Sequence, residues 1–200
     1  MRLLLHMCCG PCSCYPVKRL REEGIEPVGW FFNPNIHPYR EWEQRLNTAK
    51  EFAEKVHMEI RAEEAYRLRD FLRQALSVQE TENGRCRMCY TWRLGEAARY
   101  AAENGFTAFT STLFYSIYQQ HELMRETAER FAAQYGVDFY YEDFRPGWQE
   151  GIEISHRLAL YRQSYCGCIF SEEERYSKEI RKARKKLAKE RKRQHLAVTG

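Results

Sequence analysis

The chain of 200 residues is 44% hydrophobic and has a net charge of only +4 at neutral pH. It holds enough apolar material for one substantial core, and no stretch approaches the roughly 20 apolar residues that a membrane span needs. We therefore expect a cytoplasmic protein, and in that reducing compartment its eight cysteines favour metal binding or redox chemistry over a structural disulfide framework.

Short apolar runs alternate with amphipathic segments along the chain. Residues 3–7 are apolar except for His6, which is typical of a strand covered on both faces. Further strands are predicted at 26–32, 58–62, 107–110 and 137–142. Helical spacing predicts helices at 39–57, 66–76, 86–101 and 118–135, and another that ends near residue 161. This order predicts an α/β protein with a three-layer, doubly wound parallel sheet.

Four cysteines follow the first predicted strand directly, in the stretch Cys8-Cys-Gly-Pro-Cys-Ser-Cys14. The Gly-Pro pair ends the strand, and in parallel α/β sheets ligands bind beyond the carboxyl ends of the strands. Adjacent Cys8 and Cys9 would point to opposite faces of a regular strand, so their sulfur atoms can converge only where the strand ends. We therefore predict a metal site at this point.

A second cysteine pair opens the helix predicted at 86–101. Cys86 and Cys89 are three residues apart and share a helix face, so both sulfurs can face one metal centre. Arg85, Arg87 and Arg93 surround them, and their charges favour thiolates over thiols. Two cysteine pairs at one sheet edge can enclose an iron–sulfur cluster or a four-thiolate zinc ion.

A third pair lies in Tyr165-Cys-Gly-Cys168. A disulfide between Cys166 and Cys168 would close only a small ring, and the glycine between them gives the backbone the necessary freedom. Such a disulfide should be strained and easily reduced. The alternative is that the two cysteines supply further metal thiolates.

The charge is concentrated in a C-terminal basic helix, predicted for residues 178–200. Ten Lys or Arg and two Glu lie between Lys178 and His195, which is a net +8 and leaves −4 for the rest of the chain. Ile180, Ala183 and Leu187 recur at helical spacing. The helix either binds a polyanion such as RNA or is a solvated surface helix. We expect residues 1–177 to form a single α/β domain.

The motifs occur together in an order that resembles one known family, the cobalamin-independent epoxyqueuosine reductases, QueH. The resemblance runs from the first strand to about Ser171 and leaves the basic tail out. The motifs that carry it are Cys8-Cys-Gly-Pro-Cys12, Asn33-Pro-Asn-Ile-His-Pro38, Cys86-Arg-Met-Cys-Tyr-Thr-Trp-Arg93, Phe109-Thr-Ser-Thr-Leu113 and Tyr165-Cys-Gly-Cys168.

This resemblance implies an oxidoreductase that converts the oxirane of epoxyqueuosine, at the anticodon wobble position of certain tRNAs, to the alkene of queuosine. The implied fold is HUP-like and is shared with tRNA thiolation enzymes. In those relatives an ATP-binding loop follows the first strand. Here Cys-Cys-Gly-Pro-Cys takes the place of that loop, so ATP use is not expected.

The resemblance also implies the site residues. It assigns the ligands of a 4Fe-4S cluster to Cys8, Cys9, Cys86 and Cys89. It assigns a redox-active disulfide to Cys166 and Cys168.

Cys12 and Cys14 are left over, and Cys12 stays open between a cluster ligand, a ligand of an additional iron and a spare thiol. A cluster closed by four thiolates has no vacancy for an epoxide oxygen. We therefore hypothesise that one iron is incompletely held by cysteine, or that a further iron binds near Cys12.

Removing the epoxide oxygen as water takes two electrons and two protons. We expect an external electron donor, such as a ferredoxin or a thiol system, to supply the electrons. Candidate proton donors are His6, His37, Tyr118, His121 and Asp143, although packing or capping explains each of them as well. Aromatic side chains that could stack on an extruded base are Tyr39, Trp92, Tyr115 and Trp148.

Two other classes of protein fit parts of the same pattern. A zinc-stabilised tRNA-binding module would use the two distant cysteine pairs as a structural site. A thiol-disulfide or sulfur-transfer enzyme acting on tRNA would need Cys166 and Cys168 but no iron. Both leave the surplus of cysteines beside the first strand less well explained.

Overall fold

The computed structural model describes residues 1–78, 80–81, 83–183 and 186. The chain divides into two compact units, Met1–Arg162 and Gln163–Gly200. The boundary that we expect from composition, between residues 177 and 178, stays a prediction.

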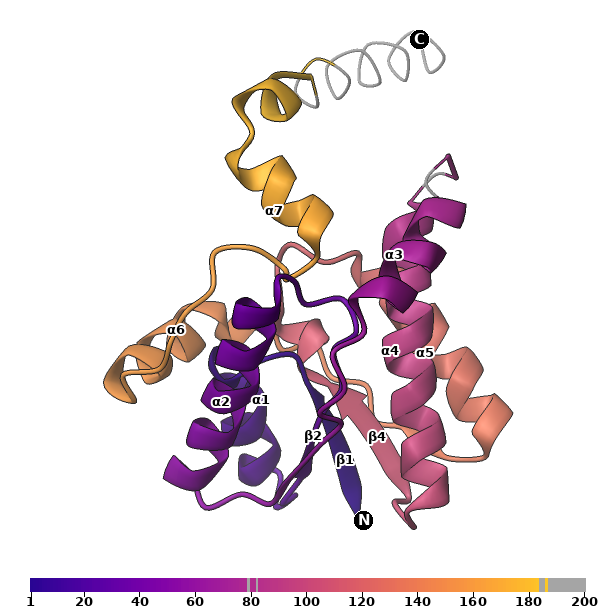
Figure 1. Cartoon of the computed structure of the whole chain (residues 1–200). Coiled ribbons are helices and arrows are strands. Elements are labelled where there is room, and N and C mark those ends of the chain that lie inside the picture. Colours follow the sequence, from indigo (N-terminus) through magenta and orange to yellow (C-terminus); the bar gives the residue numbers. More distant parts are fainter. Residues whose placement is uncertain (79, 82, 184–185, 187–200) are drawn as a thin grey trace, which may run out of the picture. The chain divides into compact units, whose positions relative to one another are not determined.

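The first unit is an α/β fold built on five parallel strands (Figure 1). The strands are β1 (Leu3–Met7), β2 (Val28–Phe31), β3 (Ile60–Ala62), β4 (Ala108–Ser111) and β5 (Asp138–Phe139). The α-helices of this unit are α1 (Gly10–Glu22), α2 (Tyr39–Lys55), α3 (Leu68–Ser77), α4 (Gly84–Glu103), α5 (His121–Tyr135) and α6 (Trp148–Arg157). Two short 3-10 helices are η1 (Thr112–Tyr115) and η2 (Arg145–Gly147).

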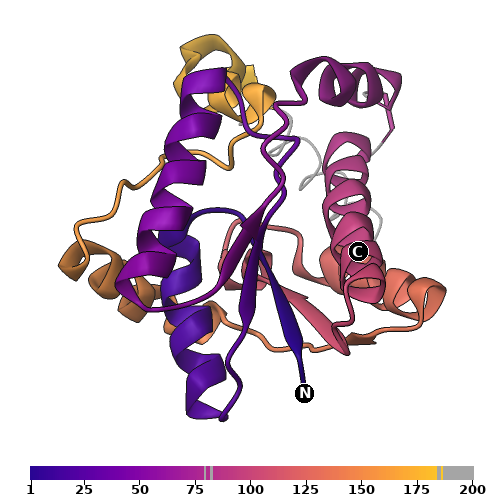
Figure 2. The same cartoon turned by 60° about the horizontal axis from the view of Figure 1, so that its bottom comes forward.

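The strands are ordered β3-β2-β1-β4-β5, so the sheet grows in both directions from β1. Helices α1 and α2 cover one face of the sheet, and α4 and α5 cover the other (Figures 1 and 2). Helix α6 packs against α1, and α3 packs against α4. The predicted three-layer, doubly wound parallel sheet is thereby confirmed.

Strand β1 lies at the centre of this sheet, and all five of its residues are buried. It pairs with β2 on one side and with β4 on the other, with His6 beside Ser111 in the register. The chain order reverses between β1 and β4, which makes this the topological switch point where ligands bind in open α/β sheets. The residues after Met7 and those after Ser111 therefore meet at one edge of the sheet.

Several element boundaries differ from the predicted ones. Strand β5 has two residues rather than the six predicted for 137–142, because it is an edge strand that pairs only with β4. Helix α5 begins at His121 rather than at 118, because the chain first forms η1 and a short connection. The apolar face predicted for the second helix is confirmed, since Trp42, Leu46 and Ala49 are all buried.

The second unit contains α7 (Ile169–Tyr176), followed by helical residues 178–183 and 186. These are the described residues of the predicted C-terminal basic helix, and the other residues from 184 to 200 lie outside the described part of the chain. Across the residues that the structure describes, none of the helices combines the length and the apolar character needed to cross a membrane.

Candidate metal centre

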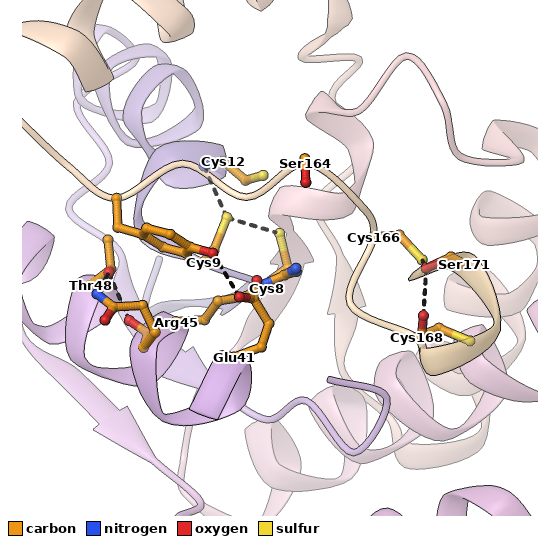
Figure 3. A network of polar contacts seen from close by, with 12 residues as sticks. Cys8, Cys9, Cys12, Glu41, Arg45, Thr48, Ser164, Cys166, Cys168 and Ser171 are labelled. Carbon is orange, nitrogen blue, oxygen red and sulfur yellow. Dashed lines mark hydrogen bonds and ion pairs between the residues drawn. The ribbon is translucent and has the colours of Figure 1, made fainter. Parts of the chain in front are cut away.

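Three sulfur atoms converge where β1 ends. The Sγ atoms of Cys8, Cys9 and Cys12, which we call the cysteine triad, all lie within 4.8 Å of one another. Those of Cys8 and Cys9 are 3.8 Å apart (Figure 3). Among the described residues, no other set of three His, Cys, Asp or Glu side chains comes this close together. Three adjacent thiols are a donor set suited to a soft metal ion.

The triad forms because a helix starts within two residues of the end of β1. Cys9 is extended, with φ −174° and ψ 171°, and is the N-cap of α1. Its sulfur accepts a hydrogen bond of 3.4 Å from the backbone N–H of Cys12, the role that a Ser or Asn oxygen has at other helix starts. Pro11 lies in the first turn, where its missing N–H costs nothing. The positive end of the helix dipole therefore meets the sulfur atoms.

Thr112, the first residue of η1, holds Cys8 across the switch point. The backbone N–H of Cys8 donates to Thr112 Oγ1 at 3.0 Å, and the Thr112 hydroxyl donates to Cys8 Sγ at 3.3 Å. Thr112 is buried, so neither bond is in competition with bulk water. One threonine thus orients both the backbone and the sulfur of Cys8.

Cys8 is the member of the triad that loses its proton first. Its pKa lies well below that of an ordinary thiol, because the thiols of Cys12 and Cys9 hydrogen-bond to its sulfur and outweigh the effect of burial, with help from Arg93 and Thr112. Burial raises the pKa of Cys9, and the hydrogen bond to Cys8 raises that of Cys12. The lowered pKa favours the thiolate of Cys8, the form of cysteine that binds metal.

A buried arginine from each helical layer lies near the triad. Arg45 of α2 donates from Nε to Glu41 Oε1 at 2.6 Å (Figure 3). Arg93 of α4 donates to Asn33 Oδ1 at 2.7 Å. The side-chain amide of Asn33 in turn donates to the carbonyl oxygen of Met7 at 2.8 Å, and this chain of bonds ties α4 to the end of β1.

Cys86 and Cys89 lie in the first two turns of α4 and are half-buried. Together with Arg93 they recur at helical spacing, so they share the helix face that is tied to the end of β1. The sulfurs that lie within 4.8 Å of one another include neither of them. Their role as ligands stays a prediction.

Cys14 differs from the triad in its hydrogen bond and in its pKa. It is buried, and its Sγ donates to the carbonyl oxygen of Gly10 at 3.6 Å within α1. Burial raises the pKa of Cys14 to about 12, so it remains a neutral thiol. Of the two cysteines that the sequence left unassigned, Cys12 joins Cys8 and Cys9 and Cys14 is a core residue.

In the second unit, Cys166 and Cys168 flank Gly167, which has a positive φ of 110°. Glycine adopts a positive φ more readily than other residues do. The thiol of Cys166 donates to Ser171 Oγ at 2.9 Å, and the Ser171 hydroxyl donates to the carbonyl oxygen of Cys168 at 2.7 Å (Figure 3). Cys168 is the N-cap of α7, so one short turn organises both cysteines. Their redox role stays a prediction.

His6 has a structural environment rather than that of a proton donor. Its Nε2–H donates to the carbonyl oxygen of Phe32 at 3.0 Å, which fixes the tautomer, and its Nδ1 accepts from the Ser111 hydroxyl at 2.7 Å. Burial, together with the charge of Arg93, lowers the pKa of His6 to about 3. His6 is therefore neutral and joins β1 to Ser111 of β4 and to Phe32, the residue after β2.

The aromatic side chains predicted to stack on a base differ in their accessibility. Tyr115 is only 3% exposed and donates its hydroxyl hydrogen to the carbonyl oxygen of Trp148, so it is a core residue. Tyr39 is exposed. Tyr118, which we named only as a proton donor, is 79% exposed and meets the Trp148 ring edge-on, with ring centroids 5.7 Å apart. Tyr118 is thus the most accessible aromatic ring near this edge of the sheet.

Sequence reasoning missed two residues of the site. Arg45 lies on the apolar face of α2, where charged side chains are rare. Its position on that face could have indicated a buried, functional arginine. Thr112 belongs to a motif that carries the family resemblance, but nothing in that motif indicates that its partner is Cys8.

Solved structures share this architecture. The crystal structure of a predicted subunit of tRNA methyltransferase from Methanocaldococcus jannaschii has a TM-score of 0.54 to this chain at 11% sequence identity, covering 80% of this chain and 75% of that one. The fold and the site therefore define a doubly wound α/β protein whose switch point carries clustered thiols.

Sequence comparison then identifies the family. The family described as epoxyqueuosine reductase QueH matches residues 3–174, and the chain belongs to it. Similar proteins with that name include those of Dehalococcoides mccartyi, 38% identical over 88% of this chain and 96% of its own length, and of Thermotoga maritima, 30% identical over 92% and 97%. A third, from Acinetobacter baylyi, is 37% identical over 85% of this chain and 80% of its own length. The chain is therefore an oxidoreductase of the epoxyqueuosine reductase family, as the motifs predicted.

Proposed function

We propose that this protein reduces epoxyqueuosine in tRNA to queuosine with an iron–sulfur cofactor held at the end of β1. The observation that carries the proposal is the cysteine triad, which lies at the switch point of the sheet in a chain of the epoxyqueuosine reductase family. Ligands of open α/β sheets bind at such points. The tRNA is the partner that this substrate requires.

The donor set fits an iron–sulfur cofactor. Cys8 and Cys9 would hold a 4Fe-4S cluster together with Cys86 and Cys89, and Cys12 would hold an additional iron or an iron of the cluster. Thiolates are the ordinary ligands of such clusters. When bound, the cofactor would supply single electrons and a Lewis-acidic iron that polarises the C–O bond of the epoxide.

The electron balance gives Cys166 and Cys168 their proposed role. Deoxygenation of the epoxide consumes two electrons and two protons and releases water. Oxidation of the Cys166–Cys168 dithiol to a disulfide yields two electrons and two protons. An external ferredoxin or thiol system would then reduce the disulfide for the next turnover. Gly167, with its positive φ, would allow the small ring to close.

The test begins with protein purified without oxygen. Iron, acid-labile sulfide and zinc are measured, absorption and EPR spectra are recorded before and after dithionite, and turnover of tRNA bearing epoxyqueuosine is assayed. We expect four or five irons per chain, as implied by one cluster with or without an extra iron, and formation of queuosine. Zinc alone would favour a zinc-stabilised tRNA-binding module.

Substitution of one cysteine sharpens this test. Cys168→Ser should abolish multiple turnovers while the protein keeps its iron. Full turnover by Cys168→Ser would remove the dithiol from the mechanism. Turnover that needs both cysteines but no iron would instead indicate a thiol-disulfide or sulfur-transfer enzyme.

The basic tail is proposed as a tRNA contact. Truncation after about Lys178 should weaken tRNA binding and reduce the slope of log Kd against log salt concentration, because each phosphate contact releases counterions. An unchanged slope would remove the tail from the interface.

A further inference from the structure

Arg93 is a buried cation without a counter-ion of its own. Its side chain is 3% exposed, and its hydrogen bond at 2.7 Å goes to the neutral amide oxygen of Asn33. No Asp or Glu in the described part of the chain forms an ion pair with it, and its Nε has no hydrogen-bond partner there. The guanidinium is therefore buried with less compensation than such a group requires.

This arrangement is costly in an isolated protein. A guanidinium stays protonated in proteins, so Arg93 cannot escape burial by losing its proton. Burying a charge without a partner costs far more than burying a neutral polar group. A buried arginine of this kind indicates that an anion lies close by in the working protein.

The geometry points to the cysteine triad as that anion. Asn33 hydrogen-bonds to both Arg93 and the carbonyl oxygen of Met7, the residue directly before Cys8. The guanidinium is thus held beside the end of β1. In agreement with this placement, the charge of Arg93 helps to lower the pKa of His6 and that of Cys8.

The other flanking arginine provides a comparison. Arg45 is 1% exposed, but it carries its own counter-ion, Glu41, at 2.6 Å. Arg45 and Glu41 neutralise each other, so the charge of Arg93 is left uncompensated beside the sulfurs. A thiolate-ligated metal cluster with excess negative charge balances that charge.

We propose that Arg93 is a positioning residue that acts as the counter-charge of the anionic centre built on the cysteine triad. Its positive charge stabilises bound thiolates and, when the cofactor is present, favours the reduced and more negative state of that centre. This inference rests on the proposed iron–sulfur function. It assigns Arg93 no contact with the tRNA.

The first experiment compares Arg93→Gln and Arg93→Lys in the holoprotein, with Arg99→Gln as a matched control. Arg99 lies on the same helix and has counter-ions of its own, Glu96 and Glu103, each at 2.6 Å. The readouts are iron and sulfide per chain, the midpoint potential from an EPR-monitored titration, and the circular dichroism spectrum. Arg93→Gln should lower the iron content or shift the midpoint potential to a more negative value. Arg93→Lys should retain most of the iron and most of the parent potential, and Arg99→Gln should match the parent protein in both.

A second variant changes the charge in the opposite sense. Glu41→Gln removes the counter-ion of Arg45 but keeps an oxygen that can accept hydrogen bonds, so it adds one net positive charge beside the triad. It should shift the midpoint potential to a more positive value. This variant keeps the proposal testable if Arg93→Gln fails to fold.

The outcomes separate this inference from the proposed function. Parent protein that binds no iron would overturn the proposed function itself. Iron-loaded parent protein with an unchanged potential and iron content in Arg93→Gln would overturn only the role of Arg93. So would a change in the KM for tRNA with no change in potential, because that result would make Arg93 a substrate contact. Equal defects in Arg93→Lys and Arg93→Gln would show that the bond to Asn33, and not the charge, matters.

Discussion

Gly10 at the start of α1 lies so close to Thr48 of α2 that an added Cβ would be 2.6 Å from the Thr48 carbonyl oxygen. Backbone atoms cannot yield at that distance as a flexible side chain can. The close approach fixes the start of α1, where Cys9 is the N-cap and Cys12 lies in the first turn. The packing of two helices therefore bears directly on the geometry of the cysteine triad.

Gly10→Ala should accordingly damage both stability and metal binding. Forcing α1 away from α2 should lower the free energy of unfolding by about 1–3 kcal/mol, the usual cost of overpacking. Urea denaturation and iron analysis would measure the two effects. Thr48→Ser in the same background removes only a methyl contact and should not rescue the variant, since the clash is with backbone. A full rescue would contradict this account.

Thr112→Val should loosen Cys8 without changing the shape of the side chain. Valine matches threonine in volume but removes the hydroxyl that bonds to both the N–H and the sulfur of Cys8. An unsatisfied buried N–H costs about 1–3 kcal/mol, and iron retention should fall. Thr112→Ser keeps the hydroxyl and should behave like the parent protein in the same denaturation and iron assays. Equal behaviour of the two variants would show that the hydroxyl is not needed.

Cys12 and Cys14 should respond differently to removal. Cys12→Ala takes a sulfur out of the triad and should lower the iron content. Cys14→Ala deletes a buried neutral thiol, so it should cost about 1 kcal/mol of stability and leave the iron content unchanged. Metal analysis of both proteins after anaerobic purification is the measurement. Loss of iron from Cys14→Ala in a folded protein would make Cys14 a ligand.

Tyr118→Ala should weaken the binding of the tRNA substrate rather than slow the chemical step. Its ring is almost fully exposed near the switch point, and stacking of a base on an aromatic ring is worth about 1–3 kcal/mol. The KM for tRNA should therefore rise by roughly 5- to 150-fold with little change in kcat. Tyr118→Phe keeps the ring and should be close to the parent protein. Leu76→Ala, at another exposed apolar residue, is the control for surface changes.

Stability should fall as the pH drops from 6.5 toward 4, and His37 should cause part of this loss. Burial lowers the pKa of His37 in the folded protein to about 4, below its ordinary value of 6.5. The unfolded chain therefore binds the proton first, and stability rises with pH in this window. Between pH 7 and pH 5 this group should account for a loss of about 2 kcal/mol.

Denaturation of His37→Gln at both pH values checks this prediction. The variant should lose about 2 kcal/mol less than the parent protein over the same interval. His57→Gln, at an exposed histidine, should keep the parent slope. A His37→Gln slope equal to that of the parent would contradict the prediction.

Much of the fold was predictable because its signals are local. The apolar run of β1 and the periodicity of α2 depend on a few neighbouring residues, and both were predicted with nearly correct bounds. The predicted convergence of Cys8 and Cys9 also followed from a local argument, since a strand cannot place adjacent side chains on one face. The predicted end of β5 was wrong, because the length of an edge strand depends on its partner strand rather than on its own residues.

The choice among the leftover cysteines was not predictable in this way. Cys12 and Cys14 are two residues apart in one helix and have similar neighbours in the sequence. The structure separates them because the sulfur of Cys12 lies close to those of Cys8 and Cys9, whereas Cys14 is buried and donates to Gly10. Helix phase relative to the sheet decides this, and a short motif does not contain that information.

By itself the sequence determined the α/β class, the family and the place where the thiols gather, because hydrophobic period, turn residues and motif order act over short stretches of chain. Only the tertiary structure decided that Thr112 orients Cys8, that Arg45 has a counter-ion and that Arg93 lacks one among the described residues. Thr112 and Cys8 are 104 positions apart. Such contacts follow from the strand order that places β4 beside β1 and from the burial that makes an unbalanced charge matter.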